Sequence, residues 1–334
     1  MQAVRETIYG FKAKWFDQHA QMHRNFNVRY FTDTNHVEIL DTKSNKLFLK
    51  KTECPTTITP KDFFLGGKVV LFGRHFELVD YLDAFTANTL SKQAQKSCVL
   101  ISHIPALGAL FTQIQHNQLT ISYAKMFLKE RNPIVIIEVV GENAIERLPQ
   151  VVNSVQSRFN NNNSFEVPTS TLEAQKLHDM YVEKPWTSPA TFTNCTCCVI
   201  QPHVLKEGHV GAVIDAILDC GLQITALELF NLDRASAAEF LELYDGVVPH
   251  FNEAVDHLTS GPCIALELQG TGEVVQRFRE IAGPWDIDMA RELKPSTIRA
   301  RYGHDRVQNA VHCTDLPEDG ILESQYFFDI LARK

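Results

Sequence analysis

Apolar and polar positions alternate with a period of two over much of the first 90 residues. This alternation is typical of half-buried β-strands. It is clearest in four runs, at 26–33, 36–42, 46–51 and 68–81. Turn-forming residues stand at 33–35, 43–45 and 66–67, and no helical stripe longer than two turns precedes about residue 84. This part of the chain is therefore predicted to be a compact, mostly β domain.

From about residue 192 the pattern changes to helices that alternate with strands. Buried strands are predicted at 192–200, 222–230 and 263–270. Helices are predicted at 208–220, at 273–282 and at 317–331, and a capping box of Ser236 and Glu239 predicts a further helix that runs to Tyr244. Before this region, the asparagine run at 160–163 indicates a polar loop or linker, and 170–181 a helix.

An internal repeat links the middle of the chain to its last third. The aligned pairs are 100–102 with 199–201, 119–121 with 222–224, and 133–138 with 262–267. The offsets are 99, 103 and 129, so the second copy has 26 more residues between its second and third elements. Chance likeness of two α/β segments is the alternative. A strand–helix–strand unit followed by a strand and a helix predicts a ferredoxin-like split βαβ fold.

The composition of the chain limits the classes of function that it can have. The chain has 334 residues, 44% hydrophobic and 22% charged, which favours two or three globular domains. The net charge of −8 argues against a nucleic-acid partner. No apolar run is long enough for a membrane helix and no signal peptide is visible, so the eight cysteines are expected to be reduced thiols in the cytoplasm. The charge is +3 over 1–92, zero over 93–185 and −11 over 186–334, which indicates a modular chain.

The sharpest local motif is the run Asn-Ala-Val-His-Cys-Thr-Asp at 309–315. A neutral imidazole can accept a phosphoryl group, so His312 is a candidate nucleophile. Arg279 and Arg299 could bind phosphate oxygens, and Glu323 could hold the other ring nitrogen of His312. The alternative is that His312 is a structural histidine and that the arginines form ordinary salt bridges.

Residues 192–334 resemble the nucleoside diphosphate kinase family. The matching segments are 260–262, 279–283, 294–299 and the run 309–315, which resembles the family signature Asn-x-x-His-Gly/Ala-Ser-Asp. That family phosphorylates its histidine in a ping-pong cycle, with nucleoside triphosphate and Mg²⁺. The resemblance implies that His312 is the nucleophile and that Glu323 orients it. It also implies nucleotide contacts by Tyr244, Arg279, Arg299, Asn309 and Thr314.

Several positions depart from the family pattern, and three of them stand where the family contacts its nucleotide. Gln201 replaces a lysine that donates to the transferring phosphate, a loss of about 10²–10³ in rate for such a donor. His250 stands where the family has a base-stacking Phe, and Trp285 where it has a nucleotide-contacting Thr. The first copy has Ser102 at the lysine position and no Asn-x-x-His motif, so it is expected to be catalytically dead.

The whole layout resembles a family in which an axonemal domain of the DM-ten type precedes two kinase domains. The N-terminal matches are 14–17, 29–31, 48–52, 62–66 and 80–83, and the strongest C-terminal ones are 192–198 and 308–320. The fold expected is α+β: a β-rich, PH-like domain at 1–92, a truncated ferredoxin-like kinase domain at 93–190, and a second, βαββαβ kinase domain at 191–334.

The resemblance implies a structural component of ciliary axonemal doublet microtubules, placed in their lumen and so in the cytoskeleton. The expected partners are tubulin and neighbouring axonemal proteins, with γ-tubulin complexes in some organisms, and neither nucleic acid nor a membrane. The alternatives are a weak kinase that transfers the γ-phosphate through phospho-His312, and nucleotide binding without transfer. The lysine-rich run 43–51 is either a solvated hairpin or a contact for acidic tubulin, and the cysteines at 195, 197 and 198 predict no metal site.

Overall fold

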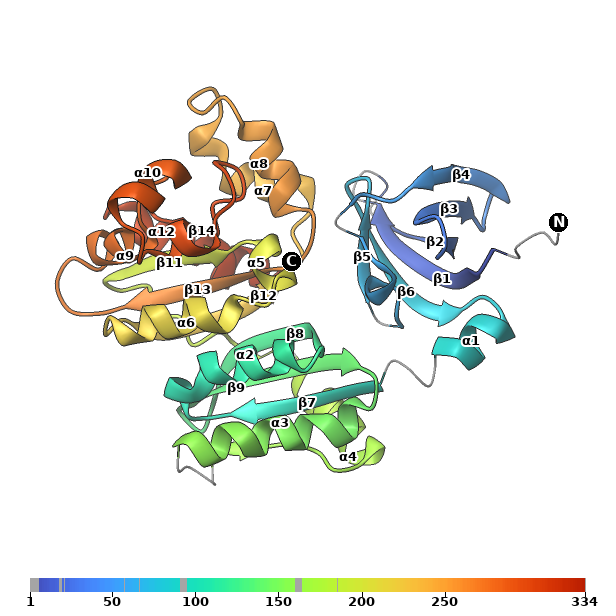
Figure 1. Cartoon of the computed structure of the whole chain (residues 1–334), viewed down its shortest axis with the longest axis horizontal. Helices are drawn as coiled ribbons and strands as arrows, with labels where there is room; N and C mark the ends of the chain where they lie inside the picture. The colour runs from blue at the N-terminus through green and yellow to red at the C-terminus, as the bar shows by residue number, and fades with distance from the viewer. Residues whose placement is uncertain are drawn as a thin grey trace. The chain divides into compact units, whose positions relative to one another are not determined.

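The computed structural model describes residues 6–333 except 18, 19, 21, 57, 66, 91–94, 160–163 and 185. The asparagine run at 160–163 therefore lies outside the described residues. The chain folds as two compact units, Met1–Gln95 and Lys96–Lys334 (Figure 1). The two kinase-like copies thus share one unit, and the boundary expected between them at 190–191 stays a prediction.

The first unit is a six-stranded antiparallel sheet with the strand order β4-β3-β2-β1-β6-β5. Its elements are β1 (Ile8–Asp17), β2 (Met22–Phe31), β3 (His36–Asp41), β4 (Lys46–Glu53), a 3₁₀ turn (Pro60–Asp62), β5 (Lys68–Leu71), β6 (Arg74–Tyr81) and α1 (Ala84–Leu90). The strands predicted at 26–51 are confirmed. The run predicted at 68–81 is a hairpin, because Phe72 and Gly73 adopt positive φ angles of 51° and 75° and turn the chain.

Aromatic side chains fill the core of the first unit. Phe11, Phe26 and Phe76 have no exposed surface, and the ring of Tyr30 stacks on Phe63 with centroids 4.0 Å apart. Alternate positions of β1, β2 and β6 supply these rings except Phe63, which follows the 3₁₀ turn, and this is why the period-two pattern is visible in the sequence. The sheet therefore has one strongly hydrophobic face.

The second unit is built on an eight-stranded sheet with the order β10-β7-β9-β8-β12-β13-β11-β14. The first repeat supplies β7 (Gln95–Ile101), β8 (Thr120–Lys129), β9 (Asn132–Gly141) and β10 (Phe165–Glu166). The second repeat supplies β11 (Cys195–Ile200), β12 (Gln223–Phe230), β13 (Cys263–Gln269) and β14 (Val311–Cys313). Counted within each repeat, the order is 4-1-3-2 followed by its mirror 2-3-1-4. The predicted repeat is therefore confirmed, and its two copies join edge to edge through β8 and β12.

Helices cover both faces of this sheet (Figure 1). They are α2 (Leu107–His116), α3 (Ala144–Phe159), α4 (Thr171–Tyr181), α5 (Pro202–Lys206), α6 (Val210–Asp219), α7 (Arg234–Phe240), α8 (Phe251–Leu258), α9 (Val274–Ala282), α10 (Ile287–Leu293), α11 (Ile298–Tyr302) and α12 (Asp319–Gln325). Short 3₁₀ turns lie at Ile104–Ala106, Glu242–Tyr244 and Leu331–Arg333, and a wider π-type turn at Tyr326–Ile330. None of the described helices has the length and apolar character needed to cross a membrane.

We call the face that packs against α2, α3, α6 and α9 the inner face of the sheet. One continuous hydrophobic core runs along it through both repeats. The other, outer face has two separate cores. In the second repeat, α7, α8 and the π-type turn cover it, and in the first repeat Tyr181 of α4 does so together with Trp186. The site residues of the second repeat lie on this outer side.

The joint between the repeats is nearly symmetric on the inner face. Helices α2 and α6 cross at Gly108 and Gly211, which are 103 residues apart, like the aligned segments around them. A Cβ on Gly211 would lie 2.1 Å from the carbonyl oxygen of Gly108, so only glycine permits this crossing. Arg147 and Arg277 add matching hydrogen bonds to the carbonyls that cap α2 and α6.

Two helix predictions need correction. The capping box of Ser236 and Glu239 is wrong, because the carboxylate of Asp233 accepts the hydrogen bond of the Ser236 N–H at 2.8 Å and starts α7 three residues earlier. The helix also ends at Phe240, and Tyr244 lies in the 3₁₀ turn that follows. The helix expected at 317–331 is α12 and two turns of different pitch.

Candidate functional site

The site is centred on His312, the middle residue of β14. This short strand pairs with β11, where His312 lies opposite Val199. Ala310, the residue directly before β14, has a φ of +73°, a conformation that costs a non-glycine residue about 1–2 kcal/mol. The imidazole is 7% exposed and packs against the edge of Phe240, with ring centroids 4.8 Å apart. The histidine is therefore held firmly and nearly buried.

A chain of hydrogen bonds fixes the orientation of this imidazole. Nε2 of His312 lies 2.9 Å from Oε2 of Glu323 on α12. The hydroxyl of Thr314 donates to the same oxygen at 2.8 Å and accepts from the backbone N–H of Cys197 at 3.0 Å. Because a carboxylate is an acceptor, it favours the tautomer with the proton on Nε2. The lone pair of Nδ1 is then available for a nucleophilic attack.

Thr314 was expected to contact a nucleotide, and the structure gives its hydroxyl a different partner. Thr314 has no exposed surface and lies behind the histidine, where it positions Glu323. The sequence reasoning also missed the backbone N–H of Cys197. No side-chain pattern could have revealed that donor, because it depends on the pairing of β11 with β14.

Arg279 and Tyr244 meet at Asp315, directly after β14. Arg279 forms an ion pair with one carboxylate oxygen, and the Tyr244 hydroxyl donates to the other at 2.5 Å. Burial raises the pKa of Asp315, but these two hydrogen bonds outweigh it and hold that pKa below its usual value. Burial also raises the pKa of Tyr244 far above its ordinary value. Asp315 was part of the recognised motif but had been given no role.

Arg299 is 4% exposed and bonded chiefly to the backbone. It donates to the carbonyl oxygens of Gly283 at 2.9 Å and Val311 at 3.1 Å. Its guanidinium also lies 5.3 Å from the ring centroid of Trp285. Arg299 therefore links the loop before α10 to β14 through hydrogen bonds, and its positive charge contributes to the electrostatic potential near His312.

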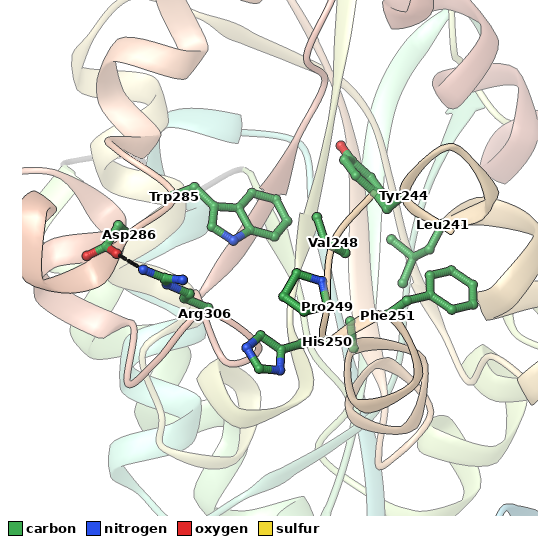
Figure 2. A pocket seen from close by; sticks show the side chains of 10 residues that line it. Leu241, Tyr244, Val248, Pro249, His250, Phe251, Trp285, Asp286 and Arg306 are labelled. Atoms are coloured by element: carbon green, nitrogen blue, oxygen red, sulfur yellow. Dashed lines mark hydrogen bonds and ion pairs between the residues drawn. The ribbon is translucent and has the colours of Figure 1, made fainter. Parts of the chain in front are cut away.

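A mostly apolar cavity of about 280 Å³ opens next to this cluster. Its walls include Leu241, Tyr244, Val248, Phe251 and Trp285. Figure 2 shows the Trp285 ring facing Tyr244 and Val248 across the cavity, with His250 and the Arg306–Asp286 ion pair at one side. A flat ring could lie between such walls, since aromatic faces stack well on aromatic and aliphatic side chains.

Two side-chain amides near His312 each have a buried oxygen atom without a hydrogen-bond donor in the described part of the chain. Oδ1 of Asn309, which is 2% exposed, has no hydrogen-bond partner among the described residues. The same holds for Oε1 of Gln201, the residue in the place of the family lysine at the start of α5. Buried polar atoms without partners are costly, and a ligand hydroxyl that donates to them would remove that cost.

The structure thus brings together most of the predicted site residues. His312, Glu323 and Thr314 form one hydrogen-bonded group, and Tyr244 and Arg279 meet on Asp315. Trp285 and His250, two of the positions that depart from the family pattern, line the cavity. The roles predicted for these residues stay predictions, because neither a ligand nor a comparison tests them.

Comparison with known proteins gives two family matches. The model of the nucleoside diphosphate kinase family matches residues 194–331, and that of the DM10 domain matches residues 2–86. The N-terminal β-rich unit is therefore a DM10 domain, and the second repeat has the nucleoside diphosphate kinase fold.

Similar proteins include one that spans nearly the whole chain. Nucleoside diphosphate kinase homolog 7 of Rattus norvegicus is 35% identical over 370 residues, which cover 97% of this chain and 93% of the rat protein. The nucleoside diphosphate kinase of Aquifex aeolicus is 35% identical over 133 residues, 40% of this chain and 92% of its own. A crystal structure of the Aquifex aeolicus kinase covers 42% of this chain and 97% of its own, at 34% identity and a TM-score of 0.39. By the full-length match and the two domain matches together, the chain belongs to the nucleoside diphosphate kinase homolog 7 family.

Proposed function

We propose that the chain is a structural protein of the ciliary axoneme, bound within doublet microtubules, whose kinase-derived unit is mainly a scaffold. Its partners would be tubulin and neighbouring axonemal proteins. The observation that carries this proposal is the difference between the outer faces of the two repeats and an active nucleotide site. In the first repeat, aromatic side chains close the outer face. In the second repeat, none of the predicted site residues is a cation that is free to bind phosphate. The DM10 domain supports the proposal through the axonemal association of its family.

In the first repeat, aromatic rings close the outer face. Phe127 of β8 packs against Trp186 with centroids 4.6 Å apart and against Tyr181 at 5.4 Å. Tyr181 and Trp186 also stack on each other at 5.7 Å. Ser102 stands where a phosphate-binding lysine would be. These features suit a packing module rather than a nucleotide site.

In the second repeat, the cations are present but engaged. Arg279 is paired with Asp315, Arg299 is bonded to backbone carbonyls, and Gln201 replaces the lysine. An incoming phosphate would have to separate Arg279 from Asp315, and it would lack one charge-assisted hydrogen bond. This arrangement of cations therefore disfavours rapid phosphoryl transfer.

The scaffold proposal is tested in ciliated cells that lack the chain. Full-length chain and the His312→Ala variant are each expressed at equal abundance, and isolated doublet microtubules are imaged by electron cryomicroscopy. We expect one density to disappear without the chain and to return with either version. Doublets that lose no density would contradict the proposal. So would a density that returns with the wild-type chain and not with His312→Ala at the same abundance.

A second candidate function, phosphoryl transfer through His312, is favoured by the 2.9 Å contact between Nε2 and Glu323. Nδ1 would attack the γ-phosphorus of a nucleoside triphosphate, the bond to the bridging oxygen would break, and the diphosphate would leave. A second diphosphate would then take the phosphoryl group from the imidazole. Both oxygens of Asp315 are engaged, so this carboxylate is no ready ligand for Mg²⁺, which would have to enter with the phosphates.

Transfer is tested by incubating the full-length chain with γ-labelled ATP and measuring acid-labile label. Activity would give label that is lost in His312→Ala, kept in the control His116→Ala, and passed on to GDP. His116 is an exposed histidine at the end of α2 and belongs to no site. No label at millimolar ATP would exclude this function. A rise in Tm with excess GDP, without label, would indicate nucleotide binding without transfer.

A further inference from the structure

A buried ion pair joins the sheet edges of the two repeats. Lys125 of β8 and Glu228 of β12 lie opposite each other where the edges of the repeats join. Nζ of Lys125 is 2.9 Å from Oε1 of Glu228, and the side chains are only 11% and 12% exposed. The contact lies within the second unit and is independent of the function proposed above.

Lys125 and Glu228 occupy the same position in their repeats. They are 103 residues apart, as are Gly108 and Gly211 at the helix crossing and the aligned segments 119–121 and 222–224. The local two-fold axis that relates the repeats therefore passes between these two side chains. At such a position, a pairing of two identical repeats would place lysine against lysine or glutamate against glutamate.

The surroundings make such like pairs costly. Oε2 of Glu228 has no hydrogen-bond partner in the described part of the chain, so Lys125 is the group that compensates the buried carboxylate. Burial raises the pKa of Glu228, and Lys125 opposes that shift. Two buried like charges would face each other with no counter-charge, which is strongly destabilising.

We propose that Lys125 and Glu228 form a heterotypic lock. Their opposite charges make the edge of each repeat specific for the other repeat of the same unit and reject a like repeat of a second chain. The partner that this surface fits is therefore the complementary repeat alone. The lock therefore disfavours the pairing of identical repeats from two chains and favours the pairing of unlike repeats, which a single chain supplies.

Charge reversals in the full-length chain test the lock. Lys125→Glu and Glu228→Lys each create a like pair, and the double variant restores an opposite pair with the charges exchanged. We expect each single variant to lower the Tm of the second unit by about 10 °C, and the double variant to regain most of that loss. The matched control is Lys12→Glu, which reverses an ion pair with Asp80 in which both side chains are more than half exposed; we expect almost no shift.

Two results would overturn the proposal. One is a pair of single variants that melt like Lys12→Glu. The other is a double variant that is as unstable as the single variants. If both single variants fail to fold, the double variant still decides between the outcomes. Only an interaction between the two charges predicts that the double variant folds, and light scattering would then show a monomer.

Discussion

The two repeats of the second unit share a strand order but differ in what covers the outer face of the sheet. In the first repeat, β8 and β9 are joined by Glu130 and Arg131, both with positive φ, as in a tight hairpin. In the second repeat, residues 231–262 replace that turn and carry α7 and α8. Tyr244 and most of the other residues that line the cavity lie in this longer segment. The same sheet thus supports either a site or a closed face, depending on one connection.

The two repeats keep the same fold, although only the second one has the residues of the candidate site. The inner core, the glycine crossing and the capping arginines are common to both repeats. The groups around His312 belong to the second repeat alone. A repeat that lacks the long connection still has to cover an apolar face, and α4 with Trp186 does so.

The largest expected effect concerns the missing lysine. Gln201→Lys should raise the rate of His312 phosphorylation by about 10²–10³, because it returns a charge-assisted donor to a site whose other groups are in place. The initial rate of acid-labile labelling from γ-labelled ATP measures this gain. Ser102→Lys, the same change in the first repeat, should add no label. An unchanged rate in Gln201→Lys would show that this lysine is not what limits the site.

The next effect concerns the symmetric joint. Gly211→Ala should lower the free energy of unfolding by about 3 kcal/mol, because the new Cβ would collide with the backbone of Gly108. Urea denaturation measures the loss. Gly246→Ala is the control: unlike Gly211, Gly246 has a positive φ, but no atom lies within 4 Å of the added Cβ, so only about 1 kcal/mol should be lost. Equal losses in the two variants would argue against a tight crossing.

The closed face of the first repeat gives a third prediction. Trp186→Ala should cost about 2 kcal/mol and increase the binding of an apolar dye, because it uncovers Phe127 and Tyr181. Trp285→Ala, which removes an indole beside the open cavity of the second repeat, should cost less. Urea midpoints and dye fluorescence report both effects. If Trp285→Ala were the more destabilising, the contrast between the faces would be wrong.

The smallest effect is a pH dependence confined to the second repeat. Burial lowers the pKa of His257 to about 4 and also lowers that of His203, whose Nδ1 lies 3.0 Å from Nε2 of His257. Below about pH 6.5 the unfolded chain binds protons that the folded chain does not, so stability falls between about pH 6.5 and pH 4. The titratable groups that face this pair include His304, Glu207 and Asp305.

Urea denaturation at pH 7.5 and 5.5 measures this dependence. The loss of stability on acidification should be smaller in His257→Asn by about 1 kcal/mol. Amide exchange at pH 5.5 should rise first in α8, and not in α4 of the first repeat. Equal acid sensitivity of the variant and the wild-type chain would contradict the assignment.

Much of the fold could be predicted from the sequence, since strands such as Cys195–Ile200 and helices such as Val210–Asp219 carry regular apolar patterns. The errors have local causes. Asp233 was overlooked as the cap of α7, and the turn at Phe72 was hidden because an apolar residue occupies it. The joining of the repeats into one sheet was not predicted, because it depends on contacts between distant residues such as Lys125 and Glu228.

The site was only partly predictable. The motif around His312 and the partner Glu323 were found through resemblance, and the structure places them in contact. The engagement of Arg279 by Asp315 was not foreseen, because the sequence gives no distance between α9 and the residue after β14. Such contacts decide whether a cation is free, and they follow from packing rather than from spacing.

The strands at the two ends of the eight-stranded sheet are also the shortest. β10 has two residues and β14 three, so neither end strand offers a long row of backbone groups to another chain. In the axonemal role proposed above, the chain would work at high local density inside a polymer, where it must not itself become a seed for fibres. Recognition by this unit is therefore left to side chains on its helices and loops, where single substitutions can retune one contact at a time.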